Sequence, residues 1–117
     1  GDIRHNQLAK AALRMGVHSL MRRAGVEQID TLVLTGAFGA RFDWSNACGI
    51  GMFPDMSVFG SFRVVENAAG VGAVMALLDA RVREEAQALS RDITFLELAE
   101  EPGFAAEFPS FMWFPCL

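Results

Sequence analysis

Cysteine is scarce in this sequence, which has two among its 117 residues, Cys48 and Cys116. Neither has a partner at the CxxC spacing, so we predict no disulfide framework and no metal-cluster site. We interpret Cys48 as a free buried thiol and expect a reducing, cytoplasmic setting. His5 and His18 have no cysteine or carboxylate at a ligand spacing, so no metal ligands are predicted.

Long apolar runs and excess positive charge are also missing. No run reaches the roughly 18 residues that span a bilayer, and the polar residues from Asp2 onward do not predict a signal peptide. The formal net charge is −4, so the basic footprint of a nucleic-acid-binding protein is absent. No Ser/His/Asp or Cys/His arrangement is evident, and the catalytic residues stay unknown. We therefore predict neither a membrane nor a nucleic-acid partner.

Apolar residues, by contrast, are abundant. They make up 52% of the chain, against 21% charged residues. The length suits one compact domain, 1–117, and is too short for two. A slight apolar excess is typical of a domain whose core is completed by a neighbour or by a second copy in an oligomer.

Helical periodicity is clearest over residues 3–24, where apolar residues recur at i, i+4 and i+7. Asp2 is the predicted N-cap and Gly25 the residue that ends the helix. A second face carries a basic line four residues apart: Lys10, Arg14, His18 and Arg22. We interpret this line as a solvated face, the alternative being a dock for an acidic partner.

The rest of the chain alternates between strand-like and helix-like segments. Strands are predicted at 29–34, 61–65 and 93–98. One helix is predicted after Asp43, its N-cap, to about Gly49, and another after Asn67 to about Arg91. The aromatic tail 104–114 is expected to pack rather than extend into water, whereas Glu100 and Glu101 are expected to be solvated. The order predicts an α/β fold, a small parallel or mixed sheet with flanking helices. Three strands make a small sheet, which suggests part of something larger.

The first candidate site is the sequence Leu-Thr-Gly-Ala-Phe-Gly at 34–39. A strand that ends in a Gly-x-x-Gly turn places bare backbone at the carboxyl edge of a sheet, where α/β folds bind ligands. No Walker A or GxGxxG pattern is present. The segment is therefore either a tight structural turn or a ligand-binding loop, and its sequence does not decide between them.

The second candidate is Glu-Asn-Ala-Ala-Gly-Val-Gly-Ala at 66–73, which follows a strand and opens a helix. Asn67 is a possible cap for that helix, whose first amides would face an anion. The alternative is that Gly70 and Gly72 permit close helix packing.

Three segments together resemble the C-terminal domain of the reductive activators of corrinoid proteins and their ferredoxin-like relatives. They are Asp-Ile-Arg at 2–4 with Gln-Leu-Ala-Lys-Ala-Ala at 7–12, the motif at 34–39, and Asn-Ala-Ala-Gly at 67–70 with Gly-Ala at 72–73. Their order and separations also match. The likeness runs from Asp2 to about Phe114 and includes Met-Trp-Phe-Pro at 112–115.

The resemblance implies one half of an actin-like (ribonuclease-H-like) ATPase domain, the C-terminal part of a larger iron–sulfur protein. Such a parent uses ATP with magnesium to return a cobalt(II) corrinoid protein to cobalt(I), with electrons passing through a two-iron two-sulfur cluster in its N-terminal domain. The implied partners are the corrinoid protein of a methyltransferase system and the rest of the parent chain. The implied nucleotide-binding residues are Thr35, Gly36, Ala37, Phe38, Gly39 and Asn67.

Two departures bear on this expectation. The family commonly has glycine before its Asn-Ala-Ala-Gly motif, where this chain has Glu66, and a carboxylate there either repels a phosphate or points to solvent. No set of cluster-ligating cysteines is present, so this chain is not the electron carrier. The alternative is a non-catalytic docking or dimerisation module, such as one half of a homodimer, in which the glycine loop is only a turn.

Overall fold

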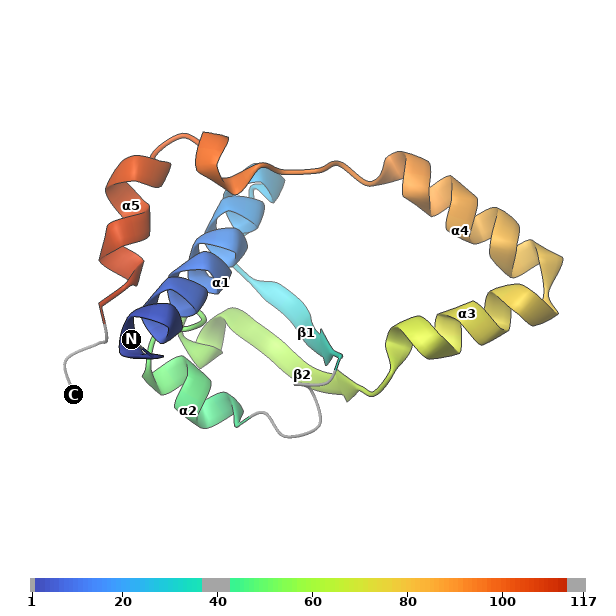
Figure 1. The fold of residues 1–117 in the computed structure, drawn as a ribbon, viewed down its shortest axis with the longest axis horizontal. Coiled ribbons are helices and arrows are strands. Elements are labelled where there is room, and N and C mark those ends of the chain that lie inside the picture. The colour runs from blue at the N-terminus through green and yellow to red at the C-terminus, as the bar shows by residue number, and fades with distance from the viewer. Residues whose placement is uncertain (1, 37–42, 114–117) are drawn as a thin grey trace. The chain divides into compact units, whose positions relative to one another are not determined.

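The computed structural model describes residues 2–36 and 43–113 of the chain. The chain divides into two compact units (Figure 1). Unit 1 comprises Gly1–Leu32, Phe42–Phe62 and Glu97–Leu117, and unit 2 comprises Val33–Arg41 and Arg63–Leu96. The division falls inside both strands of the sheet, so each strand contributes residues to both units.

Unit 1 begins with the long helix α1, Asp2–Ala24, which confirms the predicted amphipathic helix. Its C-terminal end closes as expected at Gly25, which has a φ of 67°. The Gly25 amide donates to the carbonyl of Arg22, and the Val26 amide donates to the carbonyl of Met21. These two bonds form a Schellman motif, in which a left-handed glycine satisfies the last carbonyls of the helix.

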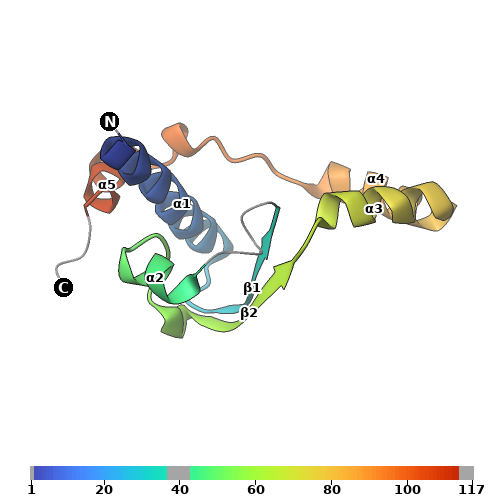
Figure 2. The same ribbon diagram turned by 60° about the horizontal axis from the view of Figure 1, so that its bottom comes forward.

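Helix α5, Phe104–Phe111, lies beside α1 in both ribbon views (Figures 1 and 2). Lys10 of α1 is 2% exposed, and its Nζ donates to the carbonyls of Phe111, at 2.7 Å, and Trp113. An ammonium group at the C-terminal end of a helix satisfies free carbonyls and complements the helix dipole. The aromatic tail therefore packs on α1 as predicted, although Trp113 itself is exposed.

A short 3-10 helix, η3 at Leu98–Glu100, precedes α5. The residue after it, Glu101, is 6% exposed and pairs with Arg23 of α1 at 2.6 Å. The prediction that Glu101 is a solvated charge was wrong. Its carboxylate is buried because the guanidinium supplies the partner that a buried charge requires.

The apolar core of unit 1 lies around helix α2, Trp44–Gly49, and η2, Met56–Val58. Asp43 caps α2 as predicted, since its side chain accepts from the Asn46 amide. The buried apolar side chains of this core are Ala47, Phe53 and Phe59. Cys48 packs against them and is half-buried, and Cys116 lies outside the described residues.

Strands β1, Ile29–Thr35, and β2, Phe59–Val65, pair as a two-stranded parallel sheet. Gly60 allows their close approach, because a Cβ there would lie 2.7 Å from the carbonyl oxygen of Asp30. The third strand predicted at 93–98 was wrong. Residues 93–97 are neither helix nor strand, and Phe95 is 82% exposed. An apolar run becomes a strand only when another strand edge pairs with it.

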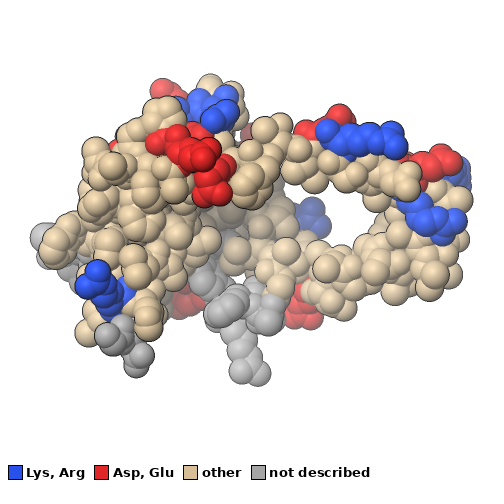
Figure 3. Space-filling model, turned by 45° about the horizontal axis from the view of Figure 1, so that its top comes forward, with Lys and Arg blue, Asp and Glu red and all other residues tan. Residues whose placement is uncertain are grey.

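Unit 2 contains helices α3, Ala68–Leu78, and α4, Ala80–Asp92, which pack on one another. The sequence predicted one helix here, and the break falls at Asp79. This residue ends α3 and caps α4 by accepting from the Arg81 amide at 2.9 Å. Acidic and basic side chains intermix over α4 in Figure 3.

The described ranges 2–36 and 43–113 contain no helix that is both long and apolar enough to cross a membrane. Neither α3 nor α4 has a buried residue. The large side chains of α3 are exposed: Val71, Val74, Met75, Leu77 and Leu78.

Candidate functional site

The first predicted loop begins where β1 ends. Thr35 is the last residue of the strand, and Gly36 follows it with a φ of 90°. A side chain at this φ is strained, so a glycine is required for the turn as built. The backbone of Gly36 is exposed, and a Cβ added there would have no heavy atom within 4 Å. Ala37, Phe38 and Gly39 lie outside the described residues.

The second predicted motif opens α3. Asn67 stands at the N-cap position with φ 50° and ψ 42°, the left-handed conformation, and its side chain makes no capping hydrogen bond. Asn67 therefore occupies the predicted cap position, but its side chain does not cap the helix. Asparagine tolerates this backbone region better than most residues do, so the chain reverses here at modest cost. Glu66, just before it, is exposed.

A side chain from the first motif contacts the second. The hydroxyl Oγ1 of Thr35 accepts a hydrogen bond from the backbone amide of Ala68 at 3.4 Å. This amide is one of the first N–H groups of α3, which have no partner inside the helix. The end of β1 and the start of α3 therefore lie together, and Thr35 provides the contact that Asn67 was expected to make.

A shallow groove of about 440 Å³ runs along α3 from this junction. It is lined by Asn67, Gly70, Val71, Val74 and Met75. The lining has one polar side chain, the carboxamide of Asn67, and no charged group. Such a surface suits a flat apolar group that carries hydrogen-bonding atoms at one edge, and it offers nothing to a phosphate or a metal ion.

Gly70 lines the end of this groove nearest to Asn67, which we call the head of the groove. A Cβ built on Gly70 would lie 2.5 Å from both Nδ2 and Oδ1 of Asn67. The carboxamide thus occupies the space that any larger residue would need. This contact follows no recognised sequence motif, although the i, i+3 spacing of Asn67 and Gly70 places them on one helical face.

A second polar cluster lies in unit 1, where the basic line of α1 contacts α5. Lys10 is buried and Arg14 and His18 are half-buried, whereas Arg22 at the end of the line is still exposed. The guanidinium of Arg14 lies 5.1 Å from the centre of the Phe111 ring, and the His18 ring meets the edge of the same ring. The prediction of a solvated basic face was wrong. The four-residue spacing of the basic line does place its side chains on one face of α1. The acidic and aromatic residues that contact this face come from the far end of the chain.

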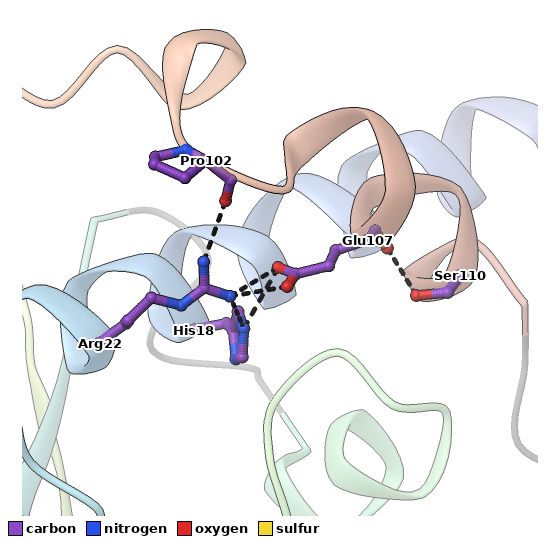
Figure 4. A network of polar contacts seen from close by, with 5 residues as sticks. All are labelled: His18, Arg22, Pro102, Glu107 and Ser110. Carbon is purple, nitrogen blue, oxygen red and sulfur yellow. Dashed lines mark hydrogen bonds and ion pairs between the residues drawn. The ribbon is translucent and has the colours of Figure 1, made fainter.

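Figure 4 shows how Arg22 joins this cluster to α5. One guanidinium nitrogen lies 2.7 and 2.8 Å from the two carboxylate oxygens of Glu107, and the other donates to the carbonyl of Pro102. His18 lies 3.3 Å from the same carboxylate. These charges are satisfied within the chain, which makes the cluster a structural contact between α1 and α5.

Two hollows of about 350 and 440 Å³ adjoin this cluster, and both are lined by Arg14 and Pro54. Burial lowers the pKa of Arg14, and burial together with nearby Arg14 lowers the pKa of Lys10.

The remaining reactive groups in the described part of unit 1 do not form a site. Burial, with a smaller contribution from Asp55, raises the pKa of the Cys48 thiol, so this thiol is a poor nucleophile near neutral pH. No group of three or more metal-ligating side chains gathers in the described residues. The junction of β1 and α3 is the better candidate site.

The chain is similar to known proteins over nearly its whole length. Residues 1–116 match a family model described as the C-terminal domain of RACo, the ASKHA domain. The chain is also similar to the corrinoid activation enzyme RamQ of Eubacterium limosum, with 36% identity over 105 residues. That alignment covers 88% of this chain and 18% of the relative. The chain therefore spans less than a fifth of the length of the curated relative that it matches.

Proposed function

The chain belongs to the family of RACo C-terminal domains, the ASKHA domains, and on that premise we propose that it is the C-terminal nucleotide-binding part of an ATP-dependent activator of corrinoid proteins. The parent protein would return an inactive cobalt(II) corrinoid protein to cobalt(I). One electron would come from an external reductant through a two-iron two-sulfur cluster in another domain, and ATP hydrolysis would drive the transfer. The similarity to a corrinoid activation enzyme supports this role.

The observation that carries the proposal is the junction of β1 and α3. A glycine turn at the carboxyl end of a strand and the start of a helix are held together by the Thr35–Ala68 hydrogen bond. In α/β folds this is the edge of the sheet at which ligands bind. Exposed backbone at Gly36, the hydroxyl of Thr35 and the carboxamide of Asn67 would contact the nucleoside part of ATP.

The lining of the groove along α3 indicates that this chain would hold only part of the nucleotide. The groove has apolar walls and one amide, which fits a nucleotide base but not a magnesium–triphosphate group, whose ligands are carboxylates and cations. The phosphates and magnesium would thus be held by residues outside this chain. The iron–sulfur cluster would also lie elsewhere, since two cysteines cannot supply its four ligands. We also propose that both units form one domain and that the parent works in the cytoplasm.

The decisive experiment uses the intact parent with a cobalt(II) corrinoid protein and a reductant. We expect an ATP-dependent rise of the cobalt(I) absorption band. Gly36→Ala should remove the ATP dependence, because a side chain at φ 90° forces the loop into another conformation.

Gly25→Ala is the matched control for this test. Gly25 also has a positive φ, and a Cβ there also meets no heavy atom within 4 Å, but it ends α1 in unit 1. The two variants carry a similar backbone cost at different places. If both lose ATP dependence equally, the effect is one of stability and the nucleotide role of the loop is wrong.

A second candidate function is a docking or dimerisation module, favoured by the exposed apolar side chains of α3. It predicts self-association, or binding of the corrinoid protein, that nucleotide does not change. Sedimentation of the chain at several concentrations tests the dimer. A strictly monomeric species would remove that version.

A further inference from the structure

We propose that Gly70 is a positioning residue of the nucleotide-binding region, because its missing side chain leaves the space in which the carboxamide of Asn67 lies. The consequence for ligand binding rests on the proposed function, in which Asn67 contacts the nucleotide. The positioning itself depends on this chain alone.

A larger residue at position 70 would force the side chain of Asn67 to move. A Cβ on Gly70 would lie 2.5 Å from Nδ2, 2.5 Å from Oδ1 and 2.8 Å from Cγ of Asn67. Turning the amide over would exchange its nitrogen and oxygen and leave the clash unchanged, because both atoms are equally close. The carboxamide can escape only by moving as a whole, through a new side-chain rotamer.

The backbone of Asn67 has little freedom to absorb this movement. Its φ of 50° and ψ of 42° lie in the small left-handed region. Helix α3 begins at the next residue, Ala68, whose amide donates a hydrogen bond to Thr35. A methyl group at Gly70 would therefore move the Asn67 carboxamide away from the head of the groove while α3 stays in place.

Gly72 provides the control within the same helix. It lies two residues further along α3, where a Cβ would meet no heavy atom within 4 Å, and it does not line the groove. Gly70→Ala and Gly72→Ala bring the same gain in helix propensity. They differ in whether the new methyl group meets Asn67.

The first experiment measures the position of the carboxamide directly. In the ¹⁵N-labelled 117-residue chain, Gly70→Ala should shift the side-chain amide signals of Asn67 and Gly72→Ala should leave them in place. Equal shifts in the two variants, or none in either, would overturn the positioning. Backbone amide signals of α3 report whether each variant still folds.

The second experiment asks whether the position matters for nucleotide, and uses the intact activator. Gly70→Ala should raise KM for ATP by roughly tenfold, the effect of one lost hydrogen bond, with kcat nearly unchanged. Gly72→Ala should leave both constants as they are. Asn67→Gly keeps a residue that accepts the left-handed backbone and should raise KM to a similar extent.

The double variant separates positioning from a general effect on the helix. If Gly70 acts through Asn67, Gly70→Ala should add nothing once Asn67→Gly has removed the side chain. A full additional loss in the double variant would overturn the inference, as would shifted Asn67 signals with an unchanged KM. An activator with no ATP dependence at all would defeat the proposed function instead, and the amide signals would still decide whether Gly70 positions Asn67.

Discussion

Units 1 and 2 are held together by different kinds of contact. In unit 1, helices from opposite ends of the chain meet, and Lys10 bonds to Trp113 across 103 positions of sequence. In unit 2, α3 packs on α4, its immediate neighbour in sequence, and neither helix has a buried residue. Leu78 is 79% exposed in unit 2, whereas Phe59 is 6% exposed in unit 1.

This difference indicates that unit 2, through the exposed apolar side chains of α3, is the unit suited to contact another protein surface. A group of large apolar side chains on one helix is typical of a region that another surface covers. The same unit carries the proposed nucleotide contacts, Thr35, Gly36 and Asn67. The unit whose helices have no buried residue is thus the unit that carries the proposed ligand contacts. Regions that bind ligands are often among the less stable parts of a protein.

The largest expected effect tests the comparison directly. Phe59→Ala should lower the free energy of unfolding of the 117-residue chain by about 3 kcal/mol, because it opens a cavity in the core of unit 1. Leu78→Ala should change it by less than about 0.5 kcal/mol, since the side chain is already in water. Urea unfolding followed by tryptophan fluorescence and circular dichroism measures both. Equal losses would mean that the Leu78 side chain is buried and that the two units do not differ in this respect.

The sequence predicted local structure well where neighbouring residues determine it. Both described strands, the α2 cap at Asp43 and the turn at Gly25 were confirmed. Each depends on residues a few positions apart, which sequence patterns report directly. The parallel arrangement of the sheet also agrees with the prediction of an α/β fold.

The errors concern contacts between distant parts of the chain. The basic line of α1 looked solvated because its partners, Glu107 and Phe111, lie some 85 to 100 positions away. The run at 93–98 looked like a strand because periodicity does not reveal whether a partner edge exists. In the candidate site the sequence indicated both motifs. It did not indicate the Thr35–Ala68 bond or the contact of Gly70 with Asn67, because both depend on the backbone conformation at the end of β1 and the start of α3.

A smaller effect sharpens the description of unit 1. Lys10→Met should lower the free energy of unfolding by about 2 kcal/mol, because the carbonyls of Phe111 and Trp113 lose a charged donor. Arg4→Met on the exposed surface of the same helix is the control and should cost little. Urea unfolding monitored by tryptophan fluorescence compares them. A cost for Lys10→Met no larger than that for Arg4→Met would show that α5 does not depend on this contact.

The smallest effect is expected at the junction in unit 2. Thr35→Val removes the oxygen that accepts from the Ala68 amide while keeping the shape of the side chain, whereas Thr35→Ser keeps the oxygen. The bond is long and exposed, and water can replace it, so the local cost should stay below about 1 kcal/mol. We expect the Ala68 amide to exchange with deuterium up to about fivefold faster in Thr35→Val and at its normal rate in Thr35→Ser. Equal exchange in all three proteins would mean that the start of α3 is held by the helix itself, and the strand end and the helix start would then form the site without a direct bond between them.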